Sequence, residues 1–566
     1  TSRIEARKLG PIEGRLAQLA AIREPSAVPS ALAALHRSGV PGLFIAGVAA
    51  DRRNSSVYAL YLYQGGLSLP DRDYYLKENF AEIREKYRAH LAASFTLLGE
   101  APALAQTSAE AVFALERELA EAGRPRADLR EAEKNYHRFT PTELAARYPH
   151  SLWPEYLAAR GAGSVAYVVV GQPEFFDALE ALLRRKPLAE LTTYLRWQLF
   201  RHRAAFLHAA AEEADFAFFH RVLLGQQEPE PRWKRAARLI DGEIGEALGR
   251  LYVERHFPPE ARRRMLELVE DLRTVFTARL GELEWMTPET RARALAKFER
   301  FTTKIGHPEQ YRDYTSVRID REDLLGNIAR AEEFDSDRQF SRIGGPVDRS
   351  EWGMTPPMVN AYFNPSQNEI VFPAGILQPP FFDLTADDAV NYGAIGTVIG
   401  HEITHGYDDQ GRKYDAEGNL NDWWSAADAK EFDSRAHRVE LEYNGYAPLP
   451  GEFVNGRLTL GENIADLGGL RLAYRALQRR LSLDPARRRT IDGFSPEQRF
   501  FLAYAQIWRS TCRDEEARRR LAIDPHSPPA FRVLGAVLNM SEFPQAFSIP
   551  EGQPMFRPPT DRITIW

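Results

Sequence analysis

Two histidines with a glutamate between them, His401, Glu402 and His405, form the run His-Glu-Ile-Thr-His. Residues four apart on a helix lie on one face about one turn apart, so both imidazoles could bind the same metal ion. A carboxylate beside the pair could accept a proton from another group on the metal. A zinc ion with three protein ligands and an open fourth position is a hydrolytic centre, and this spacing is typical of metalloproteases. The motif therefore predicts a zinc peptidase.

A third ligand is expected on a second helix, in the run Gly-Glu-Asn-Ile-Ala-Asp at residues 461–466. Glu462 and Asp466 are four apart and would share one helix face, so one carboxylate can bind the metal while the other orients an imidazole. Asp408 and Asp409 follow His405 closely, so a carboxylate there could hold its outer nitrogen. Taken singly, these acids are ordinary helix or surface residues. Together with the histidine pair they indicate a functional set.

A third histidine is the alternative to a glutamate ligand. It would complete the pattern HExxHxxGxxH, but Asp409 and Arg412 occupy that neighbourhood and the next histidine is His437. His437 lies among charged residues and is expected to be an exposed side chain. Because zinc enzymes of the thermolysin type take a glutamate from a following helix, Glu462 is the better candidate.

The helix that carries the histidines is expected to be buried. It runs through the mainly apolar residues 390–399 and contains several glycines, including Gly400, which suits close neighbours on several sides. Asp387 or Asp388 could cap its start. The alternative, two histidines facing solvent on an ordinary helix, is disfavoured by this apolar run.

The chain divides into a helical part and a mixed part. Apolar residues at three- and four-residue spacing predict mostly helix in residues 1–315, which would form a separate lobe. In residues 316–566, short β-like runs at 356–363 and 369–372 precede the metal-binding helices and a late proline-rich loop. The expected fold class is mainly α with a small β-sheet, with residues 316–566 as the catalytic domain.

Composition excludes several classes of protein. A hydrophobic share of 44% and a charged share of 27% over 566 residues are ordinary for a globular protein of two or more domains. With a net charge of -6, the sequence lacks the excess of positive charge that is typical of nucleic-acid-binding proteins. No apolar run is long enough to span a bilayer. The single cysteine, Cys512, is expected to be a small buried group in a helical stretch.

The chain resembles the neprilysin and endothelin-converting-enzyme family of zinc endopeptidases. Its motifs Val-Asn-Ala-Tyr, His-Glu-Ile-Thr-His and Gly-Glu-Asn-Ile-Ala-Asp are similar to those of the family and follow in the same order. The five matching stretches are residues 359–362, 370–377, 401–409, 461–469 and 526–535. The resemblance implies a two-lobed molecule, with a thermolysin-like zincin catalytic domain and a large helical lobe that encloses the active-site cavity.

The resemblance also implies a role for each matching residue near the metal. One zinc ion (Zn2+) per chain would be bound by three ligands: His401, His405 and Glu462. Glu402 would act as the general base and proton shuttle. Asp408 and Asp466 would orient the two histidines.

Substrate contacts are implied in the same way. Asn360 and the backbone of Ala361 would hold the substrate backbone as an added strand. His526 would stabilise the oxyanion, and Arg532 would bond a substrate carbonyl. Four residues resemble the apolar pocket that receives the side chain after the cut bond: Ile376, Phe381, Val398 and Trp508. Core packing is the alternative interpretation of these four.

Two departures from the family pattern matter. Ile549 and Ile563 stand where animal members carry cysteines, which indicates a prokaryotic-type member stabilised by packing alone. The sequence opens at Thr1 rather than Met, so an N-terminal piece with further substrate contacts is expected to be missing. Because export is the family's commoner habit, a periplasmic or extracellular location is favoured over the cytoplasm. A monomer is expected.

The expected function is that of a zinc-dependent endopeptidase that hydrolyses short peptides on the amino side of bulky hydrophobic residues. Glu402 would take a proton from the metal-bound water that attacks the peptide carbonyl. A non-catalytic peptide-binding homologue is one alternative, but it would lack a base or a ligand, and none is missing. A zinc amidase is another alternative. It is disfavoured by Asn360, Ala361 and Arg532, because these residues suit a substrate with an extended peptide backbone.

Overall fold

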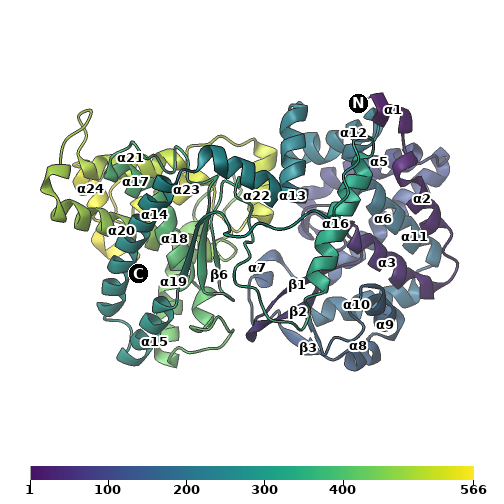
Figure 1. Ribbon diagram of the computed structural model, residues 1–566, viewed down its shortest axis with the longest axis horizontal. Helices are drawn as coiled ribbons and strands as arrows, with labels where there is room; N and C mark the ends of the chain where they lie inside the picture. Colours follow the sequence, from purple (N-terminus) through teal and green to yellow (C-terminus); the bar gives the residue numbers. More distant parts are fainter. Residues whose placement is uncertain (1) are drawn as a thin grey trace.

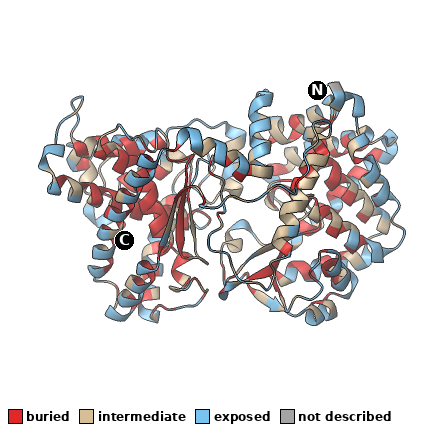
Figure 2. Ribbon diagram, viewed as in Figure 1, coloured by how far each residue is buried: buried red, intermediate tan, exposed pale blue. Residues whose placement is uncertain are grey.

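The computed structural model describes residues 2–566 as two lobes placed side by side (Figure 1). Both lobes are mostly helical, and each contains one small mixed sheet, which confirms the expected fold class. Buried residues gather inside each lobe (Figure 2). Within the described residues, no helix has the length and apolar character needed to cross a bilayer.

The N-terminal lobe is built on a four-stranded sheet in the order β1-β2-β4-β3. Strands β2 and β4 are parallel, and the other two pairs are antiparallel. The strands are β1 (Phe44–Asp51), β2 (Asn54–Gln64), β3 (His137–Phe139) and β4 (Val168–Val170). The helices around it are α1 (Ser2–Arg7), α2 (Gly10–Ala20), α3 (Val28–Arg37), α4 (Asp73–Leu76), α5 (Ala81–Leu97), α6 (Pro102–Ala122), α7 (Arg126–Leu129), α8 (Pro141–Arg147), α9 (Trp153–Ala159), α10 (Pro173–Arg185), α11 (Leu188–Arg203) and α12 (Ala209–Asp215).

The second lobe has a three-stranded sheet in the order β5-β7-β6, so that β6 is an edge strand. The strands are β5 (Thr302–Gly306), β6 (Tyr362–Asn364) and β7 (Glu369–Pro373). The helices are α14 (Pro259–Gly281), α15 (Pro288–Glu299), α17 (Asp388–Asn391), α18 (Thr397–His405), α19 (Ala426–Asn444), α20 (Leu460–Leu483), α21 (Pro496–Ile507), α22 (Asp514–Ile523), α23 (Pro529–Val537) and α24 (Glu542–Ala546). All candidate metal ligands lie in this lobe.

The apolar cores do not divide at residue 315, the boundary expected from the sequence. Residues 257–305, including most of α14 and α15, pack into the same core as the metal-binding helices. Helix α16 (Leu324–Phe340) packs instead against the N-terminal core through Leu325, Ile328 and Phe340. Helix α13 (Arg232–His256) joins the lobes, because Leu239 packs against the N-terminal core and Tyr252 and Val253 pack against the other (Figure 1).

Helices α18 and α20 approach each other closely because glycines face each other at their contact. A Cβ atom on Gly400 would lie 2.7 Å from the carbonyl oxygen of Gly469, and one on Gly469 would lie 2.5 Å from the backbone nitrogen of His401. Any larger residue would push the two backbones apart. This contact brings the histidines of α18 to the carboxylates of α20, and α18 is buried almost throughout, as expected.

Three local expectations can be compared with the structure. The Asp387 side chain caps α17 by accepting a hydrogen bond from the Ala389 nitrogen at 3.0 Å, which confirms a cap ahead of the histidine helix. The β-like run at residues 356–363 is shorter than predicted, because β6 begins only at Tyr362. The prediction for Cys512 is wrong: α21 ends at Ile507, and the cysteine is exposed in the loop before α22.

Candidate metal and active site

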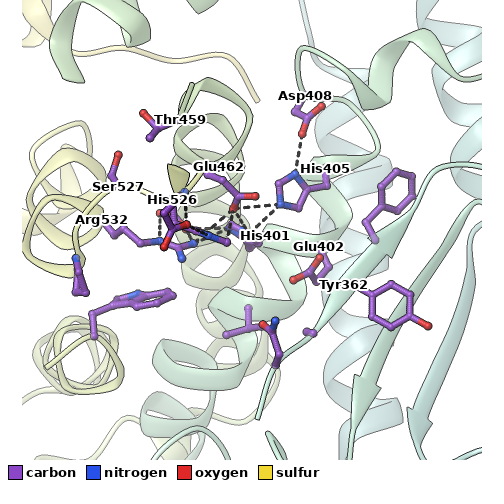
Figure 3. A pocket seen from close by; sticks show the side chains of 18 of the residues that line it. Tyr362, His401, Glu402, His405, Asp408, Thr459, Glu462, His526, Ser527 and Arg532 are labelled. Carbon is purple, nitrogen blue, oxygen red and sulfur yellow. Dashed lines mark hydrogen bonds and ion pairs between the residues drawn. The ribbon is translucent and has the colours of Figure 1, made fainter. Parts of the chain in front are cut away.

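Three side chains from two helices converge on one point (Figure 3). His401 and His405 extend from α18, and their Nε2 atoms are 2.9 Å apart. Glu462, in the first turn of α20, places its Oε2 atom 3.2 Å from Nε2 of His401 and 3.5 Å from Nε2 of His405. The candidate ligand atoms lie within 4.8 Å of one another, so one ion could contact all three.

The outer nitrogens of both histidines are held by carboxylates. Nδ1 of His401 lies 2.8 Å from Oδ1 of Asp466, and Nδ1 of His405 lies 2.7 Å from Oδ2 of Asp408. A carboxylate accepts a proton from Nδ1, which assigns the N–H to that nitrogen and leaves the lone pair on Nε2. Both lone pairs then point at the carboxylate of Glu462.

This donor set fits a zinc ion. Two imidazole lone pairs and a carboxylate oxygen would repel one another without a cation between them, and Oε2 of Glu462 is buried with no hydrogen-bond donor. Two nitrogens and one oxygen also match the ligand types of catalytic zinc sites, which use three protein ligands. The geometry therefore supports a metal site at the three residues named from the sequence.

The electrostatics of the site favour a cation. Burial acts to raise the pKa of Glu462, but the charges of His405 and His526 outweigh it and hold the pKa well below its ordinary value. Burial and His405 act to lower the pKa of His401, but the neighbouring carboxylates of Asp466 and Glu462 raise it above its ordinary value. The cluster thus holds negative charge at its centre and attracts positive charge.

Glu402 lies on α18 with the two histidines. It lines the cavity that contains the candidate metal ligands, and Figure 3 shows its carboxylate between His401 and Tyr362. It is 5% exposed, and burial raises its pKa above the ordinary value of a glutamate, against the lowering effect of the two imidazoles. Among the described residues, no group donates a hydrogen bond to this carboxylate. It is therefore free to exchange a proton with a group beside the metal site.

The loop before α23 places His526 opposite the histidine pair. Its Nδ1 atom lies 2.8 Å from Oδ1 of Asp524, and its Nε2 atom lies 3.2 Å from Oε2 of Glu462. Arg532, on α23, donates from Nε to Oδ2 and from Nη2 to Oδ1 of Asp466, both at 2.7 Å. Arg532 thus fixes the carboxylate that orients His401; its contact with a substrate carbonyl stays a prediction.

The residues expected to bind substrate all line one cavity of about 980 Å³ that also contains the metal site. Asn360 is exposed to it and Ala361 is buried, and both come directly before β6 rather than within a strand. The apolar set lines the same space: Ile376, Phe381, Val398 and Trp508. Ile376 and Val398 are also part of the apolar core, so both interpretations of these residues agree with their positions.

The N-terminal lobe contributes cavity residues that the sequence did not reveal. Arg52 lies in the turn between β1 and β2, and Arg130 follows α7. Arg130 donates from Nη2 to Oδ1 of Asp409 at 3.0 Å and from Nη1 to the carbonyl oxygen of Arg457 at 3.0 Å, so it joins the two lobes at the site. No spacing in the sequence indicates a contact across such a distance.

A buried lysine holds the loop that follows α18. Nζ of Lys297, on α15, donates to three main-chain carbonyls, those of Gly406, Gly411 and Tyr414, at 2.7, 2.8 and 2.8 Å. The loop carries Asp408, so this ammonium group also sets the position of the carboxylate beside His405. Sequence analysis did not identify Lys297, because it lies in a different element about a hundred residues away.

Two models described as peptidase family M13 match residues 1–308 and 360–563. The chain belongs to peptidase family M13. A curated M13 relative, the endothelin-converting enzyme homolog of Locusta migratoria, is 34% identical over 552 residues, which is 94% of this chain and 75% of the relative. These matches confirm the resemblance to the endothelin-converting-enzyme family.

Solved M13 structures give the same result. Zmp1 of Mycobacterium tuberculosis in complex with an inhibitor is 42% identical, with a TM-score of 0.96 over 100% of this chain and 87% of that one. The same zinc metalloprotease in an open state gives a TM-score of 0.74 over 100% of this chain and 88% of that one. The chain is therefore an M13 zinc metalloendopeptidase with a candidate metal site at the predicted histidine pair.

Proposed function

We propose that this M13 peptidase hydrolyses short peptides on the amino side of bulky hydrophobic residues, with Glu402 as the general base. One observation carries the proposal. The cluster of His401, His405 and Glu462 lies in a single cavity of about 980 Å³ together with Asn360 and an apolar set of side chains. Metal, proton acceptor, backbone anchor and side-chain pocket are thus within reach of one peptide.

His401, His405 and Glu462 would hold zinc, and Asp466 and Asp408 would fix the imidazole planes through Nδ1. When bound, zinc would polarise the peptide carbonyl and make a water molecule acidic enough to attack at neutral pH. The buried carboxylates that hold Nδ1 also increase the basicity of the ligating nitrogens. These five side chains are the metal-binding unit of the proposal.

Proton transfer would be carried out by Glu402. Its carboxylate takes the proton of the attacking water and then delivers it to the departing amine. Burial raises its pKa, which favours a group that both accepts and donates a proton near neutral pH. His526, with Nδ1 beside Asp524, would donate a hydrogen bond from Nε2 to the oxygen that becomes negative.

An extended peptide would bind along the unpaired side of β6. The strand pairs with β7 on one side only, so its other edge has free main-chain groups next to Asn360 and Ala361. The side chain that follows the cut bond would enter the apolar part of the cavity. Phe381, Val398 and Trp508 offer a surface suited to a phenylalanine or leucine side chain.

The N-terminal lobe limits substrate size in this proposal. The arrangement of the lobes is closer to the inhibitor complex of Zmp1 than to its open state, so the described arrangement corresponds to a closed one. Arg52, Arg130 and Ala132 cover the cavity from the N-terminal lobe. A peptide would have to enter while the lobes are apart and fit inside once they close, which a folded protein cannot do.

A panel of blocked peptides tests this proposal. Cleavage sites are identified by mass spectrometry for peptides that differ only in the residue after the expected cut, with phenylalanine, leucine, alanine or aspartate there. We expect cleavage before phenylalanine and leucine, loss of cleavage with a chelator, and recovery with zinc. Cleavage before aspartate at an equal rate, or rapid degradation of a native globular protein, would contradict the specificity or the size limit. Peptide binding without any hydrolysis would indicate a non-catalytic homologue.

A further inference from the structure

A second cavity of about 300 Å³ lies on the other side of α20 from the metal site. Arg471 comes nine residues after Glu462, which is about two and a half helical turns, so it points from the opposite face. The cavity is formed where α20 packs beside α14, together with the segment before α24 and the C-terminal residues (Figure 1). It is separate from the space described for the peptide.

Four arginines line this cavity: Arg279, Arg471, Arg475 and Arg562. Within the described chain, Glu542 is the one acidic residue of the lining. Arginines of this protein are elsewhere commonly paired, as Arg264 and Arg487 are with Asp388. The cavity therefore holds an excess of positive charge that its own walls do not balance.

The guanidinium groups have few partners of their own. Among residues 2–566, no carboxylate lies within 4.0 Å of Arg279 or Arg562 and neither guanidinium makes a hydrogen bond, although both Nε atoms are buried. Of the carboxylates in residues 2–566, that of Glu282 alone lies within 4.0 Å of Arg475, at 3.8 Å; the two side chains are 64% and 40% exposed, so this pair contributes little. Hydrogen-bond donors that are buried without an acceptor are destabilising unless a ligand satisfies them.

Arg471 is the most enclosed of the four. It donates to the main-chain oxygen of Asn539 at 3.0 Å and to an oxygen of Trp566, the last residue of the printed sequence, at 3.3 Å. No aspartate or glutamate side chain of the described residues lies within 4.0 Å of it. Burial, joined by the charges of Arg279 and Arg475 against the opposing charge of Glu542, lowers its pKa to about 10. The arginines thus repel one another, and an anion between them would remove that repulsion.

We propose that this cavity binds a small divalent oxyanion of the phosphate class. Guanidinium forks match the oxygens of a tetrahedral oxyanion and bind it through paired, charge-assisted hydrogen bonds. The anion would hold α20 against the segment that follows α23. Helix α20 carries Glu462 and Asp466, and α23 carries Arg532. The site would therefore stabilise the lobe that holds the metal centre without touching the peptide.

Binding of inorganic phosphate to the zinc-loaded full chain tests the proposal. Isothermal titration calorimetry and thermal unfolding are followed as phosphate or sulfate is added, with chloride as the control at the same ionic strength and pH. We expect one saturable site for phosphate and sulfate, a rise in melting temperature that follows the same binding curve, and neither effect with chloride. No saturable binding, or an equal effect of chloride, would overturn the proposal.

Variants assign the binding to this cavity. R279Q and R475Q should each weaken phosphate binding about tenfold, or about 1.4 kcal/mol, since each removes a charged donor. The matched control is R184Q on α10, an exposed arginine with no ion pair among the described residues, and it should bind phosphate as the wild type does. Because Arg475 is partly exposed, R475Q should fold even if R279Q does not. Unchanged binding by a folded R475Q would overturn the assignment.

The source of the phosphate group is resolved by two further probes. Adenosine triphosphate and vesicles that contain phosphatidic acid carry the same chemistry on larger molecules. A cavity of about 300 Å³ favours the free ion, so phosphate should bind at least as tightly as either probe. Vesicle binding that requires Arg279 and Arg475, with no binding of inorganic phosphate, would overturn the free-ion proposal and assign the arginines to a lipid surface.

Discussion

Replacing Asp466 by asparagine tests two roles of one carboxylate. Asp466 accepts two hydrogen bonds from Arg532 and one from Nδ1 of His401, and the side chains of Asp466 and Arg532 are 3% and 7% exposed. Removing one partner of a buried ion pair leaves the other charge unpaired, which costs about 3–5 kcal/mol. Losing the carboxylate behind a metal-ligating histidine lowers metal affinity about 10- to 100-fold. D466N should therefore show both losses.

The two losses can be measured separately. The free energy of unfolding is determined in urea with a chelator present, so that zinc binding does not contribute, and zinc affinity is measured by competition with a chromophoric chelator. In the double variant D466N/R532M the unpaired cation is gone, so stability should recover much of the loss while zinc affinity stays low. The matched control is D433N, whose carboxylate is 66% exposed in its pair with Arg412 and should change stability by less than about 1 kcal/mol.

The outcomes distinguish the roles. If D466N lost stability but bound zinc as tightly as the wild type, Asp466 would serve only as the partner of Arg532. If zinc affinity fell and stability did not, the argument from the buried ion pair would be wrong.

Three further substitutions have distinct expected results. E402Q should keep zinc, measured by elemental analysis, while kcat falls about 10²- to 10⁴-fold, because the proton acceptor is lost; full activity would refute its role as base. H526A should lower kcat about 10²- to 10³-fold with little change in KM or zinc content, since one oxyanion donor is removed; a change confined to KM would contradict that role. K297M leaves three buried carbonyls without a donor, so urea unfolding should show a loss of about 3–5 kcal/mol, and a loss below about 1 kcal/mol would contradict it.

The sequence predicted the local parts of the site well, because they depend on spacing within single elements. The pairs His401 and His405, and Glu462 and Asp466, are each four apart on one helix, and a helix fixes the relative direction of such side chains. The glycine expected to allow a close neighbour, Gly400, does contact α20. His437 is exposed, as its charged neighbours indicated.

The parts that depend on packing between distant segments were not predictable. Lys297 and Arg130 reach the active-site loop from elements with no motif of their own, and their roles follow only from the folded contacts. The apolar cores assign α14 and α15 to one lobe and α16 to the other, which helical periodicity alone cannot distinguish. Cys512 was misplaced because α21 ends at Ile507, so the cysteine lies in the exposed loop before α22 instead of in a helix.

Anomalous diffraction at the zinc absorption edge, from crystals of the zinc-loaded protein, tests the central claim most directly. The account predicts one strong peak about 2.0–2.2 Å from Nε2 of His401, Nε2 of His405 and a carboxylate oxygen of Glu462, and no such peak in crystals of E462A. A peak bound to other side chains, or no peak between these three residues after zinc loading, would contradict it.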